Sequence, residues 1–362
     1  MSAEFKGLGC VASDKWSDLE TVSYQVKPFG PHDIDIKIEA CGICSSDLHT
    51  LKAEWGGRKY NYPLVVGHEI VGRVISVGPQ VSSLKVGDRV GVGAQSASCL
   101  QCVDCTNDNE QYCTKSVGTY NSVYPDGSIS RGGYASHARV HEHFVFPIPD
   151  ALPSHVAGPL MCAGITVYSP LKRNGAAKGK KIGVVGLGGL GAHCVLFAKH
   201  IFGAEVTVFS RTNAKKEDAM KLGADHYIAT SEEGAFDKHF RELDLIVGTA
   251  NSTKGFDLNK YLSTLKINGR YVSVGLPADG SFDVSTKTFL RNACYMGSSL
   301  LGSRKEILEM LEACAQSTTI DFDHWVEKVP INKENAKVAL ERMHANDVRF
   351  RFCFVDYDKE FN

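Results

Sequence analysis

Four cysteines in the first third of the chain have the spacing of a metal site. They are Cys99, Cys102, Cys105 and Cys113, in the pattern C-x2-C-x2-C-x7-C. Four thiolates on one short segment match the tetrahedral geometry and the soft ligands that zinc prefers at a closed structural site. An iron–sulfur cluster is the alternative, but bacterial ferredoxin runs place the fourth cysteine closer and follow it with proline. Here Thr114 follows, and we predict structural zinc.

Cys44, His68 and Cys162 are three further residues of metal-binding type, although they lie far apart in the chain. A catalytic zinc takes three protein ligands from separate segments and keeps a fourth position open, and two cysteines with one histidine are a known set. Each residue alone is weak evidence, since a single histidine is more often a core or surface residue than a ligand. A catalytic zinc at these residues therefore requires a fold that brings them together.

A glycine-rich turn follows an apolar strand expected at residues 182–185 and precedes a helix expected at residues 190–202. Backbone amides at the start of such a helix bind a pyrophosphate, and the glycines allow its close approach. Outside this strand–turn–helix context the pattern is weak, because glycines also serve ordinary turns. We predict a dinucleotide site at Gly186, Leu187, Gly188, Gly189, Leu190 and Gly191.

The end of the next strand distinguishes NADP from NAD. An NAD site places an acidic residue about 20 residues after the glycines, where it bonds the ribose 2′-hydroxyl. Here the strand ends at Ser210 and Arg211 with no acid, and Lys215 and Lys216 follow. A hydroxyl and several cations suit a 2′-phosphate. The sequence therefore predicts NADP(H), bound through Ser210, Arg211 and Lys215.

The four-cysteine segment could instead belong to a zinc-knuckle module that binds nucleic acid. Such modules need basic and aromatic residues around the metal. The segment from Cys99 to Cys113 contains Asp104, Asp108 and Glu110 but no Lys or Arg. This local acidity favours a zinc site with a purely structural role, and we expect no nucleic-acid partner.

The composition is that of an ordinary globular protein, with 43% hydrophobic and 22% charged residues in 362. At about 150 residues per domain, two domains are expected. The formal net charge of −1 provides no overall field for nucleic acid or an anionic membrane. The most apolar stretch, residues 182–202, carries five glycines and several basic residues, so no membrane span is expected. No signal peptide is visible, which predicts a cytoplasmic protein.

The order of expected strands and helices divides the chain into two regions. The first 150 residues read as an all-β region of short strands, for example at residues 34–40, 63–66, 70–76 and 88–92. From residue 182, apolar strands alternate with helices, which is typical of a parallel sheet. These strands are expected at residues 182–185, 205–210, 227–229, 245–247 and 269–274, and the helices at residues 190–202 and 214–222. A helix at residues 304–315 and a strand at 349–355 end the chain.

Together these residues resemble the zinc-containing medium-chain alcohol dehydrogenases, and most closely the fungal NADP-dependent cinnamyl alcohol dehydrogenases. The resemblance covers essentially the whole chain, with the motifs in one order. They are residues 65–72 (VVGHEIVG), the four-cysteine segment, residues 132–135 (GGYA), residues 159–170 and residues 347–352 (DVRFRF).

The resemblance implies an α/β fold with two domains. Residues 1–158 and 297–362 would form a GroES-like β-rich catalytic domain, and residues 159–296 a Rossmann domain with a doubly wound parallel sheet that binds NADP. The active site would lie in the cleft between them. Proteins of this kind usually pair through the Rossmann domain, so we expect a homodimer.

The resemblance also assigns roles to residues. Cys44, His68 and Cys162 would hold a catalytic zinc, which with the structural zinc makes two per chain. Glu69 would approach this metal when substrate is absent. Asp47 would fix the tautomer of His68, as metal-bound imidazoles usually require.

Other positions would handle the proton and the substrate. Ser46 matches the hydroxyl that takes the alcohol proton, and His49 matches the base that passes it to solvent. Ser45 departs from the family, which commonly has glycine there. Leu51 and Trp55 would line the substrate pocket and favour apolar and aromatic aldehydes. Thr166 would lie near the nicotinamide, and we expect two further cofactor contacts, Gly275 and Ser299.

The implied activity is zinc-dependent hydride transfer between NADP(H) and a primary alcohol or aldehyde. Reduction of aromatic, cinnamaldehyde-like and aliphatic aldehydes is expected to dominate, because cells usually keep NADP largely reduced. A polyol dehydrogenase is the alternative, although those enzymes tend to present Glu where this chain has Cys162. An inactive scaffold protein is a further alternative, disfavoured because all three ligands and Ser46 are retained.

Overall fold

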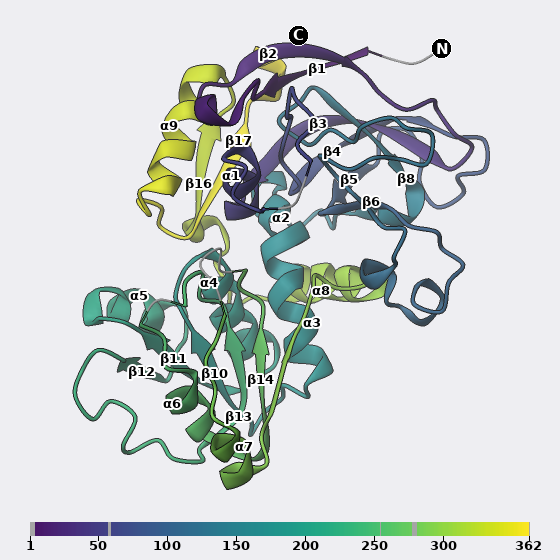
Figure 1. The fold of residues 1–362 in the computed structure, drawn as a ribbon. Coiled ribbons are helices and arrows are strands. Elements are labelled where there is room, and N and C mark those ends of the chain that lie inside the picture. The colour runs from purple at the N-terminus through teal and green to yellow at the C-terminus, as the bar shows by residue number, and fades with distance from the viewer. Residues whose placement is uncertain (1–3, 57–58, 254, 277–280, 362) are drawn as a thin grey trace. The chain divides into compact units, whose positions relative to one another are not determined.

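The computed structural model describes residues 4–56, 59–253, 255–276 and 281–361, and the chain divides into two compact units. Unit 1 comprises Met1–Cys162, Ser303–Gln316 and Asp321–Asn362, and unit 2 comprises Ala163–Gly302 and Ser317–Ile320. The domain boundaries expected after residues 158 and 296 stay predictions. Figure 1 shows the elements of both units.

Unit 1 is built on a mainly antiparallel sheet of seven strands. Its order is β16-β17-β3-β4-β5-β9, and β8 also pairs with β3. The strands are β3 (Asp33–Ile43), β4 (Ile70–Val77), β5 (Arg89–Val92), β8 (His137–His141), β9 (Phe146–Pro147), β16 (Val326–Pro330) and β17 (Arg351–Val355). Two smaller sheets pair β1 (Glu4–Gly9) with β2 (Glu20–Gln25) and β6 (Gln95–Ala97) with β7 (Val117–Gly118).

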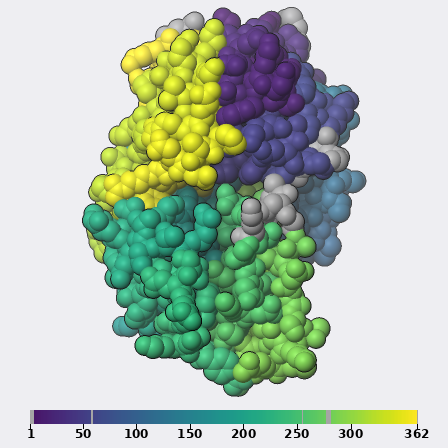
Figure 2. Space-filling model, turned by 60° about the vertical axis from the view of Figure 1, so that its left-hand side comes forward, coloured from purple at the N-terminus to yellow at the C-terminus, as the bar shows by residue number. Residues whose placement is uncertain are grey.

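The helices of unit 1 are short except for two near the end of the chain. They are α1 (Ser45–Leu51), α2 (Ser154–Pro159), α8 (Arg304–Gln316), α9 (Lys333–His344) and α10 (Tyr357–Glu360). The two ends of the chain share one surface, where α9 lies beside the N-terminal residues (Figures 1 and 2), and Lys337 of α9 pairs with Asp18 at 2.6 Å. The core beneath is apolar, with Ile34, Ile36 and Ile38 of β3 almost fully buried.

Unit 2 is a doubly wound parallel sheet of six strands, as predicted. Its order is β12-β11-β10-β13-β14-β15, so the direction of winding reverses at β10. The strands are β10 (Lys181–Val185), β11 (Glu205–Ser210), β12 (His226–Ala229), β13 (Leu243–Gly248), β14 (Leu265–Ser273) and β15 (Tyr295–Ser298). The helices are α3 (Ile165–Arg173), α4 (Gly189–Leu196), α5 (Lys216–Lys221), α6 (Leu258–Ser263) and α7 (Thr286–Asn292). In such sheets ligands bind at the carboxyl ends of the strands, next to the point of reversal.

Three expectations differ from the observed elements. The region expected to be all-β contains the helix α1. The strand expected at residues 63–66 is wrong: Leu64 forms a single bridge to Cys10, and Gly67, at φ +100°, turns the chain before a ladder can extend. The helix expected at residues 190–202 is α4 followed by a π-helical segment, Phe197–Ile201.

In the part of the chain that the structure describes, no helix is long and apolar enough to cross a membrane.

Candidate metal and cofactor sites

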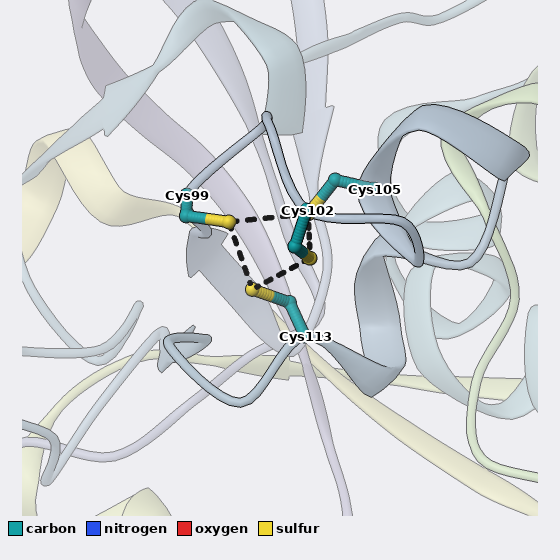
Figure 3. Close-up of side chains that lie close together, drawn as sticks. All are labelled: Cys99, Cys102, Cys105 and Cys113. Carbon is teal, nitrogen blue, oxygen red and sulfur yellow. Dashed lines mark hydrogen bonds between the residues drawn. The ribbon is translucent and has the colours of Figure 1, made fainter.

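The four cysteines between β6 and β7 meet at one point (Figure 3). Their sulfur atoms are separated by 3.9 Å (Cys99–Cys105), 3.6 Å (Cys102–Cys105), 3.8 Å (Cys102–Cys113) and 3.5 Å (Cys113–Cys99). Zinc–sulfur bonds of about 2.3 Å in a tetrahedron place sulfurs about 3.8 Å apart. No disulfide joins them, since all four thiols are free. The geometry fits one closed metal site, where the sequence predicts the structural zinc.

The backbone around these cysteines favours the thiolate form that a metal needs. N–H groups of Gln101 and Cys102 point at the sulfur of Cys99 and lower the pKa of its thiol to about 6. A thiolate, not a thiol, is the metal ligand. Burial acts in the opposite direction on Cys105 and raises the pKa of its thiol to about 12, so the backbone favours a thiolate at Cys99 in particular.

The same loop is fastened to the rest of unit 1 through Glu110. The carboxylate of this buried residue accepts a hydrogen bond from the backbone N–H of Arg304, at the start of α8, at 2.5 Å. It also lies 3.4 Å from Nε2 of His143. The Arg304 guanidinium in turn donates to the carbonyls of His143 and Val145 at 2.6 and 2.9 Å. A segment far along the chain thus anchors the four-cysteine loop.

Cys44, His68, Glu69 and Cys162 form the second group of ligand-type side chains. One ligand atom from each lies within 4.8 Å of those from the other three, and all four residues are buried. Cys44 caps α1 directly after β3, and His68 and Glu69 precede β4. Cys162 lies in the π-helical segment Leu160–Gly164. The fold therefore brings together the residues that the sequence separates.

Asp47 holds two members of this group in place. It is the third residue of α1, and its Oδ2 accepts a hydrogen bond from the backbone N–H of Cys44 at 3.0 Å, which completes a capping box. Its Oδ1 accepts from the N–H of Gly67 at 3.1 Å and lies 2.9 Å from Nδ1 of His68. Because the carboxylate occupies Nδ1, Nε2 of His68 is left facing Cys162, with its sulfur 3.1 Å away.

The donor set fits a zinc ion. Cys162 hydrogen-bonds to the sulfur of Cys44 and holds the pKa of the Cys44 thiol well below its ordinary value. Burial raises the pKa of Glu69 to about 8, although Arg351 opposes this, with its Nη1 3.3 Å from Oε1 of Glu69. The other oxygen of Glu69, Oε2, is buried and has no hydrogen-bond partner among the described residues. A buried cation would neutralise the Cys44 thiolate and would favour loss of the proton from Cys162, whose thiol has a raised pKa because of the neighbouring Cys44 and burial.

The other residues predicted around this group lie on or just after α1. Ser46 is half-buried, and His49 has its Nδ1 2.5 Å from Oε2 of Glu54. The His49 ring stacks on Trp55, with centroids 5.7 Å apart. Leu51 is fully buried in the core of unit 1. Of the two residues predicted to line a substrate pocket, only Trp55 has exposed surface.

The glycine-rich turn in unit 2 connects β10 to α4. Gly186 has φ +89°, and a Cβ on Gly191 would lie 2.0 Å from the Gly186 carbonyl oxygen, so the helix starts directly on the turn. A Cβ on Gly188 would meet no atom within 4 Å. The turn therefore offers N–H groups at the start of a helix, with room above them for a phosphate.

Positive charge lies beside this turn. The Nζ of Lys215 donates to the Leu187 carbonyl at 2.8 Å, which places the ammonium against the glycine-rich turn. Burial lowers the pKa of Lys215, and the charge of Arg211 lowers it further. Ser210 ends β11, so its hydroxyl and Arg211 lie at the carboxyl edge of the sheet. Two neighbouring cations with a hydroxyl make a suitable site for an anion.

The remaining predicted cofactor contacts also belong to unit 2. Gly275 follows β14 and Ser299 follows β15, so both lie at the same edge of the sheet as Gly186. A Cβ on Gly275 would lie 2.1 Å from the Ala250 carbonyl oxygen. Thr166 is buried in α3. Their roles as contacts of the cofactor stay predictions.

Three residues near the first group were not predicted from the sequence. Arg351 contacts Glu69, Glu54 contacts His49, and the hydroxyl of Tyr134 donates to Oδ2 of Asp47 at 3.1 Å. Tyr134 and Arg351 lie in the motifs GGYA and DVRFRF, which was the available signal. Neither motif shows which atoms its side chains reach.

Comparison with known proteins identifies the family. The alcohol dehydrogenase GroES-like domain model matches residues 30–150, and the zinc-binding dehydrogenase model matches residues 189–316. NADP-dependent alcohol dehydrogenase 6 of Saccharomyces cerevisiae is 50% identical over 361 residues, 99% of this chain and 98% of the yeast protein. The chain belongs to the zinc-containing medium-chain alcohol dehydrogenases.

This alcohol dehydrogenase is also similar to solved structures over its full length. A cinnamyl alcohol dehydrogenase from Sorghum bicolor matches with a TM-score of 0.91 and 34% identity, over 99% of both chains. A cinnamyl alcohol dehydrogenase from Helicobacter pylori, solved with NADP(H), matches with a TM-score of 0.87 and 34% identity over 100% of both chains. The predicted GroES-like and Rossmann folds are confirmed, and the chain is an enzyme.

Proposed function

We propose that this alcohol dehydrogenase transfers hydride between NADP(H) and primary alcohols or their aldehydes, mainly reducing aromatic and aliphatic aldehydes. The observation that carries the proposal is the convergence of Cys44, His68 and Cys162, with Glu69, on one buried point. The relatives named as NADP-dependent and cinnamyl alcohol dehydrogenases support the cofactor and the substrate class.

Cys44, His68 and Cys162 would hold the catalytic zinc. When bound, zinc supplies a Lewis acid that polarises a carbonyl group or lowers the pKa of an alcohol. Asp47 keeps Nε2 of His68 free for the metal, because the carboxylate hydrogen-bonds to Nδ1. Glu69 is paired with Arg351 through Oε1, and one of its carboxylate oxygens lies within 4.8 Å of the ligand atoms of Cys44, His68 and Cys162.

The proton would leave through α1. The half-buried hydroxyl of Ser46 lies two residues after Cys44, and His49 follows one turn later on the same helix. The Glu54 carboxylate lies beside Nδ1 of His49, which fixes the orientation of the imidazole on the helix. Stacking on Trp55 fixes the plane of the ring.

NADP(H) would bind at the carboxyl edge of the parallel sheet in unit 2. When bound, the dinucleotide supplies or accepts the hydride. The turn from Gly186 to Gly191 would take the pyrophosphate, while Ser210, Arg211 and Lys215 would take the 2′-phosphate. The side chain of Lys215 spans both, since its ammonium is bonded to Leu187 within the turn.

Trp55 favours flat, apolar aldehydes over sugars as substrates. A polyol would need polar partners for several hydroxyls, whereas an aromatic ring gains from stacking on an aromatic side chain. The retention of Cys162 at the third ligand position also argues against a polyol dehydrogenase.

We further propose that the enzyme is a homodimer paired through β15. This strand ends the sheet of unit 2, and all four of its residues are exposed. Exposed apolar residues precede, occupy and follow this strand in the sequence: Leu290, Tyr295 and Leu300 are 84%, 59% and 46% exposed. An open edge with apolar flanks is a surface on which a second copy can pair symmetrically.

One experiment tests the main proposal. Purified enzyme is assayed with NADPH and a panel of cinnamaldehyde, benzaldehyde, hexanal and a sugar, and its zinc is counted by mass spectrometry. We expect two zinc ions per chain and turnover of the first three substrates. Cys44→Ser should lose one zinc and nearly all activity, whereas Cys294→Ser, a buried thiol of unit 2, should keep both. Full activity of Cys44→Ser after chelation would refute the catalytic role of zinc.

A further inference from the structure

Tyr134 lies at the centre of the GGYA motif, to which neither the metal site nor the cofactor site assigns a role. Its side chain is fully buried. Its backbone is tied to the segment that leads to His68: the N–H groups of Gly132 and Tyr134 donate to the carbonyls of Val65 and Val66 at 2.8 and 2.9 Å. The motif therefore runs alongside the residues that deliver a metal ligand.

The phenol ring is packed against this segment. A Cβ on Gly67 would lie 2.6 Å from Cδ1 of Tyr134, so the ring rests on the glycine just before His68. On another side the ring meets Phe354 of β17 edge to face, with centroids 4.9 Å apart. These contacts fix the position of the hydroxyl and do not depend on it.

The hydroxyl of Tyr134 is one of several donors around Asp47, and the side chain of Tyr120 is another. It donates to Oδ2 at 3.1 Å, the oxygen that also accepts from the N–H of Cys44 at 3.0 Å. The opposite oxygen faces His68. Asp47 is fully buried, so water cannot replace a lost donor without a rearrangement. Burial raises the pKa of Tyr134 well above its ordinary value, which keeps the hydroxyl a donor.

We propose that Tyr134 is a positioning residue for the catalytic metal, acting through Asp47 on Cys44 and His68. The inference rests on the zinc ligands proposed above. Groups that orient metal ligands typically change metal affinity about 10- to 100-fold when they are removed. Since Tyr134 acts one contact further out, we expect an effect near the lower end of that range.

The test compares Tyr134→Phe with Tyr357→Phe in zinc-loaded enzyme. Tyr134→Phe keeps the ring and removes only the hydroxyl. Tyr357→Phe is the matched control. The hydroxyl of Tyr357 is also buried and donates at 2.9 Å to the carbonyl of Gly133, the residue next to Tyr134 in the chain. Zinc release to a chelator is followed with a metal-sensitive dye, and Cys44→Ser identifies which phase belongs to the catalytic site. Tyr134→Phe should release that zinc about tenfold faster, while Tyr357→Phe should not.

Two further readouts separate positioning from general stability. Cobalt substituted at the catalytic site should show a shifted visible spectrum in Tyr134→Phe and an unchanged one in Tyr357→Phe. In an Asp47→Asn background, Tyr134→Phe should have no additional effect, because the two residues would act in series.

The outcomes distinguish this inference from the proposed function. If Cys44→Ser and the unmodified enzyme hold equal zinc, the ligand set itself is wrong. If the unmodified enzyme holds the catalytic zinc but Tyr134→Phe releases it no faster than Tyr357→Phe, only the role of Tyr134 is refuted. If zinc release were accelerated equally in both variants, the hydroxyl of Tyr134 would have only a general structural role.

Discussion

At the scale of residues, the group of ligand-type side chains is held in place by two residues that would bind no metal, Asp47 and Arg351. The ligands Cys44, His68 and Cys162 could be predicted from the sequence because metal ligands come from a short list of residue types. Arg351 could not, since DVRFRF holds two arginines two residues apart, which an extended strand would place on the same face. In the structure β17 begins only at Arg351, so Arg349 stays exposed before the strand while Arg351 is buried beside Glu69.

The preference for NADPH should depend on Arg211. Arg211→Ala removes a charge-assisted hydrogen bond to the 2′-phosphate, which is worth about 1.5–3 kcal/mol. Each 1.4 kcal/mol is a factor of ten, so kcat/KM for NADPH should fall about 10- to 100-fold while that for NADH stays constant. Lys221→Ala, which removes an exposed lysine of α5 paired with Glu217, is the control. An unchanged NADPH to NADH ratio would contradict the assignment.

The buried pair of Arg351 and Glu69 should matter more for stability than an exposed pair. Arg351→Met leaves Oε1 of the buried Glu69 side chain without its donor and should lower the free energy of unfolding by about 1–3 kcal/mol. Arg73→Met breaks a surface pair, with Nε 3.1 Å from Oε1 of Glu39, and should cost about 0–1 kcal/mol. Urea unfolding of the zinc-loaded variants measures both, and similar losses would show that Arg351 is not structurally important.

At the scale of elements, strands and helices with a strong periodicity of apolar residues were predicted. Short elements that depend on one local contact, such as a helix cap, were not. Helix α1 was missed because its N-cap is Cys44, which is not a usual capping residue, while Asp47 completes the box. By contrast α8 was expected at residues 304–315. It starts with a regular capping box, in which Ser303 and Glu306 exchange hydrogen bonds of 2.9 and 3.2 Å.

The junction between the four-cysteine loop and α8 should depend on Glu110. Glu110→Ala leaves the N–H of Arg304 without its carboxylate partner, at a cost of about 1–3 kcal/mol for a buried donor. Glu312→Ala, an exposed position on the same helix, should change stability by less than about 0.5 kcal/mol. Unfolding in urea gives both values. Limited proteolysis should cut the 99–113 loop faster in Glu110→Ala alone, and equal cutting rates would show that Glu110 does not anchor the loop.

At the scale of the whole molecule, the sequence changes from short strands to strands that alternate with helices. This change predicted the two fold classes, but it does not locate the residue at which one domain ends. The chain passes from unit 1 to unit 2 inside an unbroken helical run, from α2 through the π-helical segment to α3. Gly158, Pro159, Gly164 and Pro170 lie within this run without interrupting it, so composition does not mark the crossing. Cys162, a proposed metal ligand, is the last residue of unit 1 before the crossing.

Assembly is the property of the whole molecule that the exposed surface of unit 2 predicts. Leu290 is 84% exposed on α7, the helix that precedes β15 in the chain, and we expect a dimer through β15 to cover it, so Leu290→Glu would place a carboxylate in that interface. A buried charge without a partner costs several kcal/mol, so the dimer should dissociate at micromolar protein. Val338→Glu is the control, because it makes the same apolar-to-acidic change at an exposed position of α9 in unit 1, and it should leave the dimer intact. Light scattering after size exclusion reports the mass, and an unmodified enzyme at the single-chain value of 39.4 kDa would refute the dimer.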